Sequence, residues 1–211
     1  MSKDYKTAAI LALVTILYNL AEGAISVFFG YTDETLALFG FGIDSFIEVI
    51  SGIGILQMVL RIRNNPGSPV TSFEITALRI TGYGFYALSL GLAAGIVVNI
   101  AMGRKPESTF WGTVIALVSI LVMIWLVILK RKTGRALRSE PILADANCTL
   151  VCIYMSLVLL ASSALYELTG FAYADAIGAA GLIWFSVKEG SESLEKARKR
   201  SYAACSCHTG S

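Results

Sequence analysis

Charged residues are scarce in this sequence. Asp, Glu, Lys and Arg together make up 15% of its 211 residues, while hydrophobic residues make up 55%. Soluble globular domains carry about 25% charged residues, and the mean hydropathy of +0.68 is also far from a soluble average. The composition therefore argues against a soluble protein and indicates a chain that lies mostly within a membrane.

Motifs for nucleotide binding and covalent catalysis are absent as well. The sequence has no Gly-rich phosphate loop, no Walker motif and no nucleophile elbow. Its one histidine is His208, and its four cysteines do not form the pattern of a secreted disulfide framework. We therefore expect neither an enzyme nor a nucleic-acid-binding protein, and no resident cofactor.

Long apolar runs separated by short polar loops dominate the sequence. Each run is near or above the roughly 20 residues that a helix needs to cross a bilayer. Because lipid offers the backbone no hydrogen bonds, each run is expected to be helical. Gly91 and Gly95 form a GxxxG pattern, which permits close helix packing. The sequence thus predicts an all-α membrane protein with six transmembrane helices, at residues 6–30, 35–62, 73–102, 109–129, 141–166 and 171–189.

Basic residues set the expected orientation. They gather before the first run, around the second loop, in the fourth loop from Lys130 to Arg138, and after the sixth run. The opposite side carries only Arg104 and Lys105. Cytoplasmic loops are enriched in Lys and Arg. Both termini are therefore expected in the cytoplasm, in a multi-pass protein of the plasma membrane or an inner membrane.

Residues 1–195 are expected to form one transmembrane domain, followed by a short cytoplasmic tail at residues 196–211. The tail contains Cys205, Cys207 and His208. Cys and His side chains at this spacing can bind a metal ion. A terminus without fixed structure explains the same residues equally well, so both interpretations stay open.

Two acidic residues lie in the middle of the second run. Asp44 and Glu48 are four residues apart, so a helix places both carboxylates on one face. A charge at this depth costs about 2.5–3.5 kcal/mol on insertion scales. Because the two charges also repel, the pair is expected to share a proton, a basic side chain or a metal cation. A hydrogen-bonded packing pair with a shared proton is the alternative to a pair of metal ligands.

Two cysteines in the fifth run repeat this spacing. Cys148 and Cys152 lie near the centre of their run, at the depth expected for Asp44 and Glu48. Two carboxylates and two thiolates suit tetrahedral Zn²⁺, and the sulfur atoms favour softer ions such as Cd²⁺. The ligands must lose protons when the metal binds, which couples metal movement to proton movement. The alternative is that each cysteine is a small buried hydrophobic residue.

Other polar residues near this depth have more than one interpretation. Glu22 is expected to carry protons, to hydrogen-bond to the metal ligands or only to pack. Asn19 is a candidate for the same support of the ligands, or for a hydrogen bond between helices. Asp145 and Asp175 are expected to cap or orient helix ends, with Asp145 also a candidate for proton coupling or ligand support.

Four segments together carry a family resemblance. They are residues 19–23, residues 36–48 (LALFGFGIDSFIE), residues 143–152 (LADANCTLVC) and residues 173–176 (YADA). They resemble the first, second, fifth and sixth helices of the transmembrane domain of the cation diffusion facilitator family. Its second helix carries an (H/D)-S-x-x-D-type pair, and its fifth helix carries A-D-x-x-H-x-x-x-D. The resemblance spans roughly residues 6–195.

The resemblance implies export of a divalent metal ion, usually zinc, by alternating access with proton antiport in a homodimer. By position, the implied metal ligands are Asp44, Glu48, Cys148 and Cys152. The sequence departs from the family in having Cys148 and Cys152 where His and Asp are usual, and Glu48 where Asp is usual. We also expect it to lack the family's cytoplasmic metal-binding domain.

Two other functions fit the same sequence. One is a membrane metal sensor or regulatory binding protein that keeps the fold and does not transport. The other is a proton-coupled carrier of an organic cation, for which aromatic residues are plentiful but no intramembrane aromatic cage is evident from their spacing.

Overall fold

The computed structural model of the chain is built from α-helices, as expected for the all-α fold class. It describes residues 2–33, 35–65, 72–102, 108–137, 140–171 and 173–206, and no strand occurs among them. The six helices are α1 (Ser2–Thr32), α2 (Leu36–Asn64), α3 (Ser72–Met102), α4 (Phe110–Leu137), α5 (Glu140–Thr169) and α6 (Ala174–Ser206).

Five helices, α1 to α5, are long and apolar enough to cross a membrane. The sixth, α6, is 33 residues long but is not among them, because charged residues fill its second half. Its first half packs against the other helices and buries Ala174, Ala179 and Leu182 completely. The charged segment after residue 189 continues this helix to Ser206.

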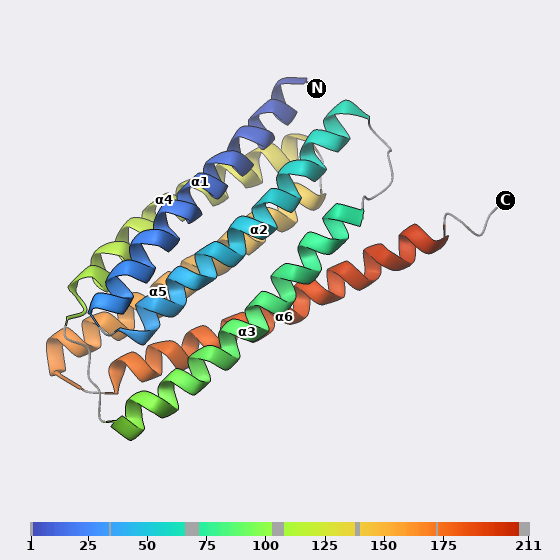
Figure 1. Cartoon of the computed structure of the whole chain (residues 1–211). Helices are drawn as coiled ribbons and strands as arrows, with labels where there is room; N and C mark the ends of the chain where they lie inside the picture. Colours follow the sequence, from blue (N-terminus) through green and yellow to red (C-terminus); the bar gives the residue numbers. More distant parts are fainter. Residues whose placement is uncertain are drawn as a thin grey trace.

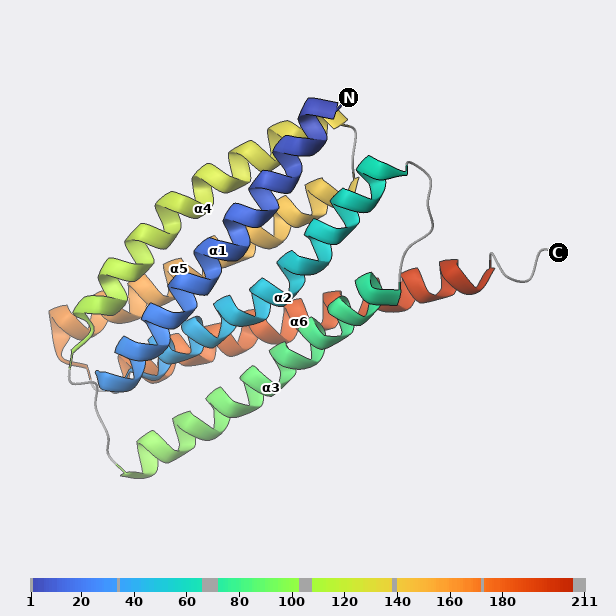
Figure 2. The same ribbon diagram turned by 45° about the horizontal axis from the view of Figure 1, so that its top comes forward.

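The helices pack chiefly in three pairs, α1 with α2, α4 with α5, and α3 with α6. The first two pairs are consecutive in the chain, whereas α3 and α6 are distant in sequence and lie side by side in both views (Figures 1 and 2). Both termini lie toward the same end of the bundle (Figure 1).

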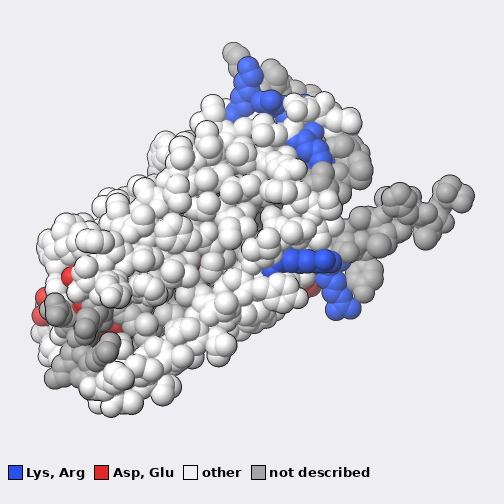
Figure 3. Space-filling model, in the orientation of Figure 1, with Lys and Arg blue, Asp and Glu red and all other residues white. Residues whose placement is uncertain are grey.

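Charge is divided between the two ends of the bundle. Lys and Arg gather at the end that carries the termini, and Asp and Glu appear at the other end, with an uncharged surface between them (Figure 3). Arg61 and Arg63 end α2 on the basic side, and Arg135 ends α4 there. An uncharged belt between polar ends is the surface that a bilayer requires. The assignment of the basic end to the cytoplasm stays a prediction.

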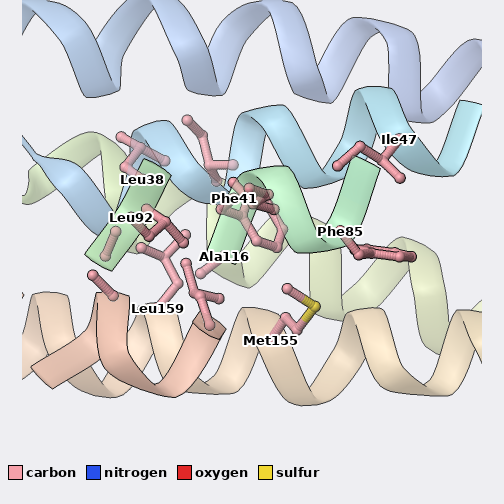
Figure 4. Close-up of a cluster of buried hydrophobic side chains, with 13 residues drawn as sticks. Leu38, Phe41, Ile47, Phe85, Leu92, Ala116, Met155 and Leu159 are labelled. Atoms are coloured by element: carbon pink, nitrogen blue, oxygen red, sulfur yellow. The ribbon is translucent and has the colours of Figure 1, made fainter. Parts of the chain in front are cut away.

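The apolar core fills the acidic half of the bundle. Side chains from α2 to α6 meet there in one cluster of fully buried residues, of which Leu38, Phe41, Leu92, Ala116, Met155 and Leu159 are labelled in Figure 4. These residues come from the first turns of α2, the end of α3, the start of α4 and the second half of α5. Because all these segments adjoin the acidic end, side chains close the bundle on that side.

Glycines bring the backbones of α1 and α2 together. A Cβ atom on Gly42 would lie 2.7 Å from the backbone nitrogen of Val27, and one on Gly30 would clash with the backbone of Phe39. Gly91, by contrast, has no atom within 4 Å of the position where its Cβ would lie. Close packing through the GxxxG pattern is therefore wrong at Gly91 but is found at Gly95, whose Cβ would lie 2.8 Å from a methyl carbon of Leu36.

A carboxylate from α6 caps the start of α2. Thr35, the N-cap residue of α2, makes no capping hydrogen bond with its side chain. Instead, the two oxygens of Asp175 accept hydrogen bonds from the backbone N–H groups of Leu36 and Ala37, both at 2.9 Å. These N–H groups have no partner within the helix, and a negative charge there also meets the positive end of the helix dipole. Asp175 thus orients a helix end, as expected.

The α1–α2 contact can be tested with a matched pair of glycine variants. Gly42→Ala should lower the free energy of unfolding by about 1–3 kcal/mol, because the added methyl group overpacks a backbone contact. Gly91→Ala should leave it unchanged or raise it by up to about 1 kcal/mol, because alanine favours the helix and meets open space. Chemical unfolding in detergent micelles measures both, and equal effects would contradict the assigned contact.

The cap on α2 can be tested at Asp175. Asp175→Ala should lower the unfolding free energy by about 1–3 kcal/mol, because two buried N–H groups lose a charged acceptor. Asp175→Asn should cost less, because its carbonyl oxygen still accepts one of the two hydrogen bonds. Thermal unfolding of the purified variants gives the order, and a parent-like Asp175→Ala variant would refute the cap.

Candidate functional site

A polar cavity of about 40 Å³ lies in the basic half of the bundle. This volume exceeds the roughly 10–15 Å³ that one water molecule requires. Five helices contribute to the wall, and α4 is the helix that does not. The wall residues with chemistry relevant to cation binding are Asn19, Glu48, Asp145, Cys148, Cys152 and Glu189.

Glu48 and Cys152 are in direct contact across α2 and α5. The Cys152 thiol donates to Oε1 of Glu48 with a sulfur–oxygen distance of 2.5 Å, and the Asn19 amide donates to Oε2 at 2.9 Å. Three helices therefore meet at one carboxylate. A Zn²⁺ ion bound tetrahedrally by both atoms would hold them about 3.5 Å apart, given usual zinc–sulfur and zinc–oxygen bonds. The pair must open by about 1 Å to admit the ion.

Cys148 and Asp44 lie near this pair in different settings. Cys148 is partly buried on the cavity wall, one turn before Cys152, and both cysteines are free thiols. Asp44 is 2% exposed and is not among the wall residues, and its Oδ1 atom has no hydrogen-bond partner among the described groups. In the described part of the chain, no three His, Cys, Asp or Glu side chains converge closely enough to hold a metal ion.

Cys152 lies partly in hydrophobic surroundings, as expected for a cysteine that is only a small buried hydrophobic residue. One side of this residue packs in a buried cluster with Leu11 of α1 and with Met123 and Leu126 of α4. Its thiol nevertheless points to Glu48. The same thiol also lies 3.3 Å from the backbone carbonyl oxygen of Cys148, so Cys152 makes both apolar and polar contacts and its role as a metal ligand stays a prediction.

Glu22 lies one turn after Asn19 on α1 but is not among the residues that line the cavity. Tyr18 donates to its Oε1 at 2.8 Å, and Ser45 donates to its Oε2 at 3.1 Å. It borders a second, apolar pocket of about 260 Å³ between α1 and α4, beside Trp111. Ser45 follows Asp44 directly, so Glu22 adjoins the acidic pair through α2. Its part in proton coupling stays a prediction.

Asp145 forms an ion pair with Lys130, a residue that the sequence analysis assigns to a cytoplasmic loop. Its Oδ2 atom lies 2.9 Å from Nζ of Lys130, which also donates to Thr149 at 2.8 Å. Lys130 is 1% exposed. Its assignment to a cytoplasmic loop is therefore wrong, because α4 continues to Leu137 and carries Lys130 inside the bundle. Because a run of basic residues follows Lys130, the sequence suggests a loop that begins at Lys130.

The residues that line the cavity from α6 were also not predicted from the sequence. Glu189 and Ser193 line the wall from α6, and Thr81 lines it from α3. Glu189 ends the predicted sixth span, where an acidic residue is ordinarily taken to lie at the membrane surface. The four-residue spacing of Glu189 and Ser193 is the signal that places both on one helix face.

The tail residues Cys205, Cys207 and His208 cannot be placed against this site. Residues 207–211 lie outside the described part of the chain, and no side chain after Lys199 is described. Metal binding by the tail therefore stays a prediction.

Comparison with known families gives one match. The sequence matches the family described as the cation efflux transmembrane domain over residues 9–199. The matched range includes parts of all six helices and every residue named above on the cavity wall. No curated protein matches the chain.

The Lys130–Asp145 pair can be tested with a double-mutant cycle. Asp145→Asn should lower the unfolding free energy by about 3–5 kcal/mol, because it leaves a buried ammonium group without its counter-charge. Lys130→Met should cost less, because the remaining Asp145 carboxylate borders the cavity and can be hydrated. The double variant should be more stable than the sum of the single effects predicts, by about 0.5–3 kcal/mol. Chemical unfolding in micelles gives the coupling, and strict additivity would contradict the ion pair.

Proposed function

The chain belongs to the cation efflux transmembrane domain family, and from this premise we propose that it exports a divalent metal ion from the cytoplasm. It is a multi-pass membrane protein from a family of cation transporters. The proposed first substrate is Zn²⁺, with Cd²⁺ as a second, because thiolate ligands favour soft ions. Asp44, Glu48, Cys148 and Cys152 are the proposed ligands.

The contact between Glu48 and Cys152 is the observation that carries this proposal. It joins a carboxylate of α2 to a thiol of α5 at the depth where both helices adjoin the cavity. Cys148 borders the same cavity, and the unpartnered Oδ1 of Asp44 is a buried acceptor that a cation can satisfy. A small opening of α2 from α5 would present these groups to one ion.

The position of the cavity supports a direction of transport. The cavity lies in the basic half, and the apolar cluster around Phe41 and Leu159 fills the acidic half. If the basic end faces the cytoplasm, as the distribution of Lys and Arg favours, the described conformation accepts ions from the cytoplasm. Release on the other side then requires the apolar cluster to open, as alternating access demands.

Protons are the proposed counter-ions. The contact between Cys152 and Glu48 is made through the thiol proton, and a metal ion that takes both atoms must displace it. Inward proton movement would then reload the ligands after metal release. The homodimer implied by the family resemblance stays a prediction.

Flux measurements in liposomes test the ligand assignment. The double variant Cys148→Ser, Cys152→Ser should lose at least about tenfold in Zn²⁺ and Cd²⁺ flux, because hydroxyl groups do not replace thiolates as soft-metal ligands. A matched double variant, Cys205→Ser with Cys207→Ser, removes the two thiols of the predicted tail and tests separately whether the tail takes part. Parent-like flux from the first double variant would remove the thiols from the ligand set.

The same preparation distinguishes the alternatives. Tight Zn²⁺ binding by the parent without any flux would favour a membrane metal sensor or regulatory binding protein. Neither binding nor flux of a divalent ion, together with uptake of an organic cation, would favour the organic cation carrier.

A further inference from the structure

Glu189 is a buried carboxylate on the cavity wall that the proposed ligand set does not use. It is 7% exposed and comes from α6, a helix that contributes none of the four proposed ligands. A carboxylate removed from water requires a compensating cation or hydrogen bonds. Neither a hydrogen bond nor an ion pair joins it to another residue of the described part of the chain.

The lysines closest to Glu189 in the chain are engaged with other groups. Lys188 lies over the ring of Trp184, 5.9 Å from its centroid, and Lys196 pairs with Glu192 at 3.6 Å. The buried Lys130 contacts Asp145 and Thr149. The charges of Lys188 and Lys196 act on Glu189 from beyond ion-pair distance, so its carboxyl group borders the cavity without a direct counter-ion in the described part of the chain.

Two buried oxygen atoms on the same wall point to an occupant of the cavity. Oδ1 of Asn19 and Oγ1 of Thr81 are both buried and have no hydrogen-bond partner among the described groups. Both residues line the cavity with Glu189. Buried polar atoms in native proteins are almost always satisfied by protein, water or an ion. An unpaired amide oxygen and a carboxylate in the wall of one cavity favour a positively charged or hydrated occupant.

The chemistry of this wall differs from that of the proposed thiol site. Glu189, Thr81 and Asn19 offer only oxygen atoms, with a single negative charge among them. Carboxylate, amide and hydroxyl oxygens suit hard divalent ions such as Mg²⁺ and Mn²⁺, which keep several water ligands. A cavity of about 40 Å³ has room for an ion together with a few of its waters.

We propose that Glu189, with Asn19 and Thr81, forms a second cation-binding position in the cavity, which holds a partly hydrated divalent ion. The position adds to the proposed function and does not depend on its thiol ligands. In the transport cycle, an ion would meet this oxygen-lined position with its water shell largely intact. It would lose its water when it moves to Glu48 and the cysteines.

Mn²⁺ binding tests the position without reference to transport. Free Mn²⁺ is counted by its electron paramagnetic resonance signal while the full-length protein in lipid nanodiscs is titrated. Glu189→Gln should weaken Mn²⁺ binding by at least about tenfold. This is the loss of affinity expected when a charged group that binds the ion, or that supports a ligand of the ion, is removed. Glu189→Asp should bind more tightly than Glu189→Gln, because it keeps the carboxylate. Glu195→Gln is the matched control on the same helix, since Glu195 is exposed and pairs with Lys199 at 2.7 Å.

Cd²⁺ binding in the same samples separates this position from the thiol site. Cd²⁺ bound to thiolates gives an ultraviolet charge-transfer absorbance that an oxygen site does not give. Glu189→Gln should retain this absorbance, which also shows that the variant is folded. Cys148→Ser with Cys152→Ser should lose the absorbance and keep its Mn²⁺ affinity within about twofold.

Three results of the Mn²⁺ titrations would overturn the second position. They are equal Mn²⁺ affinity in the parent and in Glu189→Gln, equal losses in Glu189→Gln and Glu195→Gln, and loss of Mn²⁺ binding in the cysteine double variant. Loss of the Cd²⁺ absorbance in both Glu189→Gln and Glu189→Asp would also overturn it, because Glu189 would then support the fold or the thiol site. Failure of metal flux in liposomes, with Mn²⁺ binding lost only at Glu189, would reject the proposed transport and leave the second position standing.

Discussion

The cost of placing carboxylates inside an apolar bundle is the constraint on which the rest of this structure depends. Four intramembrane acids are matched to specific partners: Glu22 to two hydroxyl groups, Glu48 to an amide and a thiol, Asp145 to Lys130, and Asp175 to the start of α2. Each partner comes at least in part from another helix. The acids therefore determine which helices meet and at what height, in addition to any role in binding ions.

The division of the bundle into an apolar half and a polar half follows from the same constraint. Side chains such as Phe41 and Leu159 form a buried apolar cluster in the acidic half. The cavity in the basic half is lined in part by polar groups that have no hydrogen-bond partner among the described side chains, including Glu189 and the amide oxygen of Asn19. The bundle is thus filled by an apolar cluster toward one end and contains a cavity lined by polar residues toward the other.

The close approach of α1 and α2 connects this division to the candidate ligands. Backbone contact at Gly42 fixes α1 against α2, and this allows Asn19 to reach Glu48. The contact between α2 and α5 at the same level rests on one thiol–carboxylate hydrogen bond and on neighbouring side chains. The α2–α5 side is therefore the easier one to open, and it is where the proposed ion would enter.

The sequence by itself determined the helical fold, the approximate spans and the two candidate ligand pairs, because apolar runs and four-residue spacing are local properties of the chain. Tertiary structure alone decided that Lys130 enters the bundle, that Glu22 borders the pocket between α1 and α4, and that Glu189 borders the cavity. Hydropathy gives the depth of a residue but not the direction in which it faces around its helix. That direction follows from packing between helices distant in sequence, such as α3 against α6.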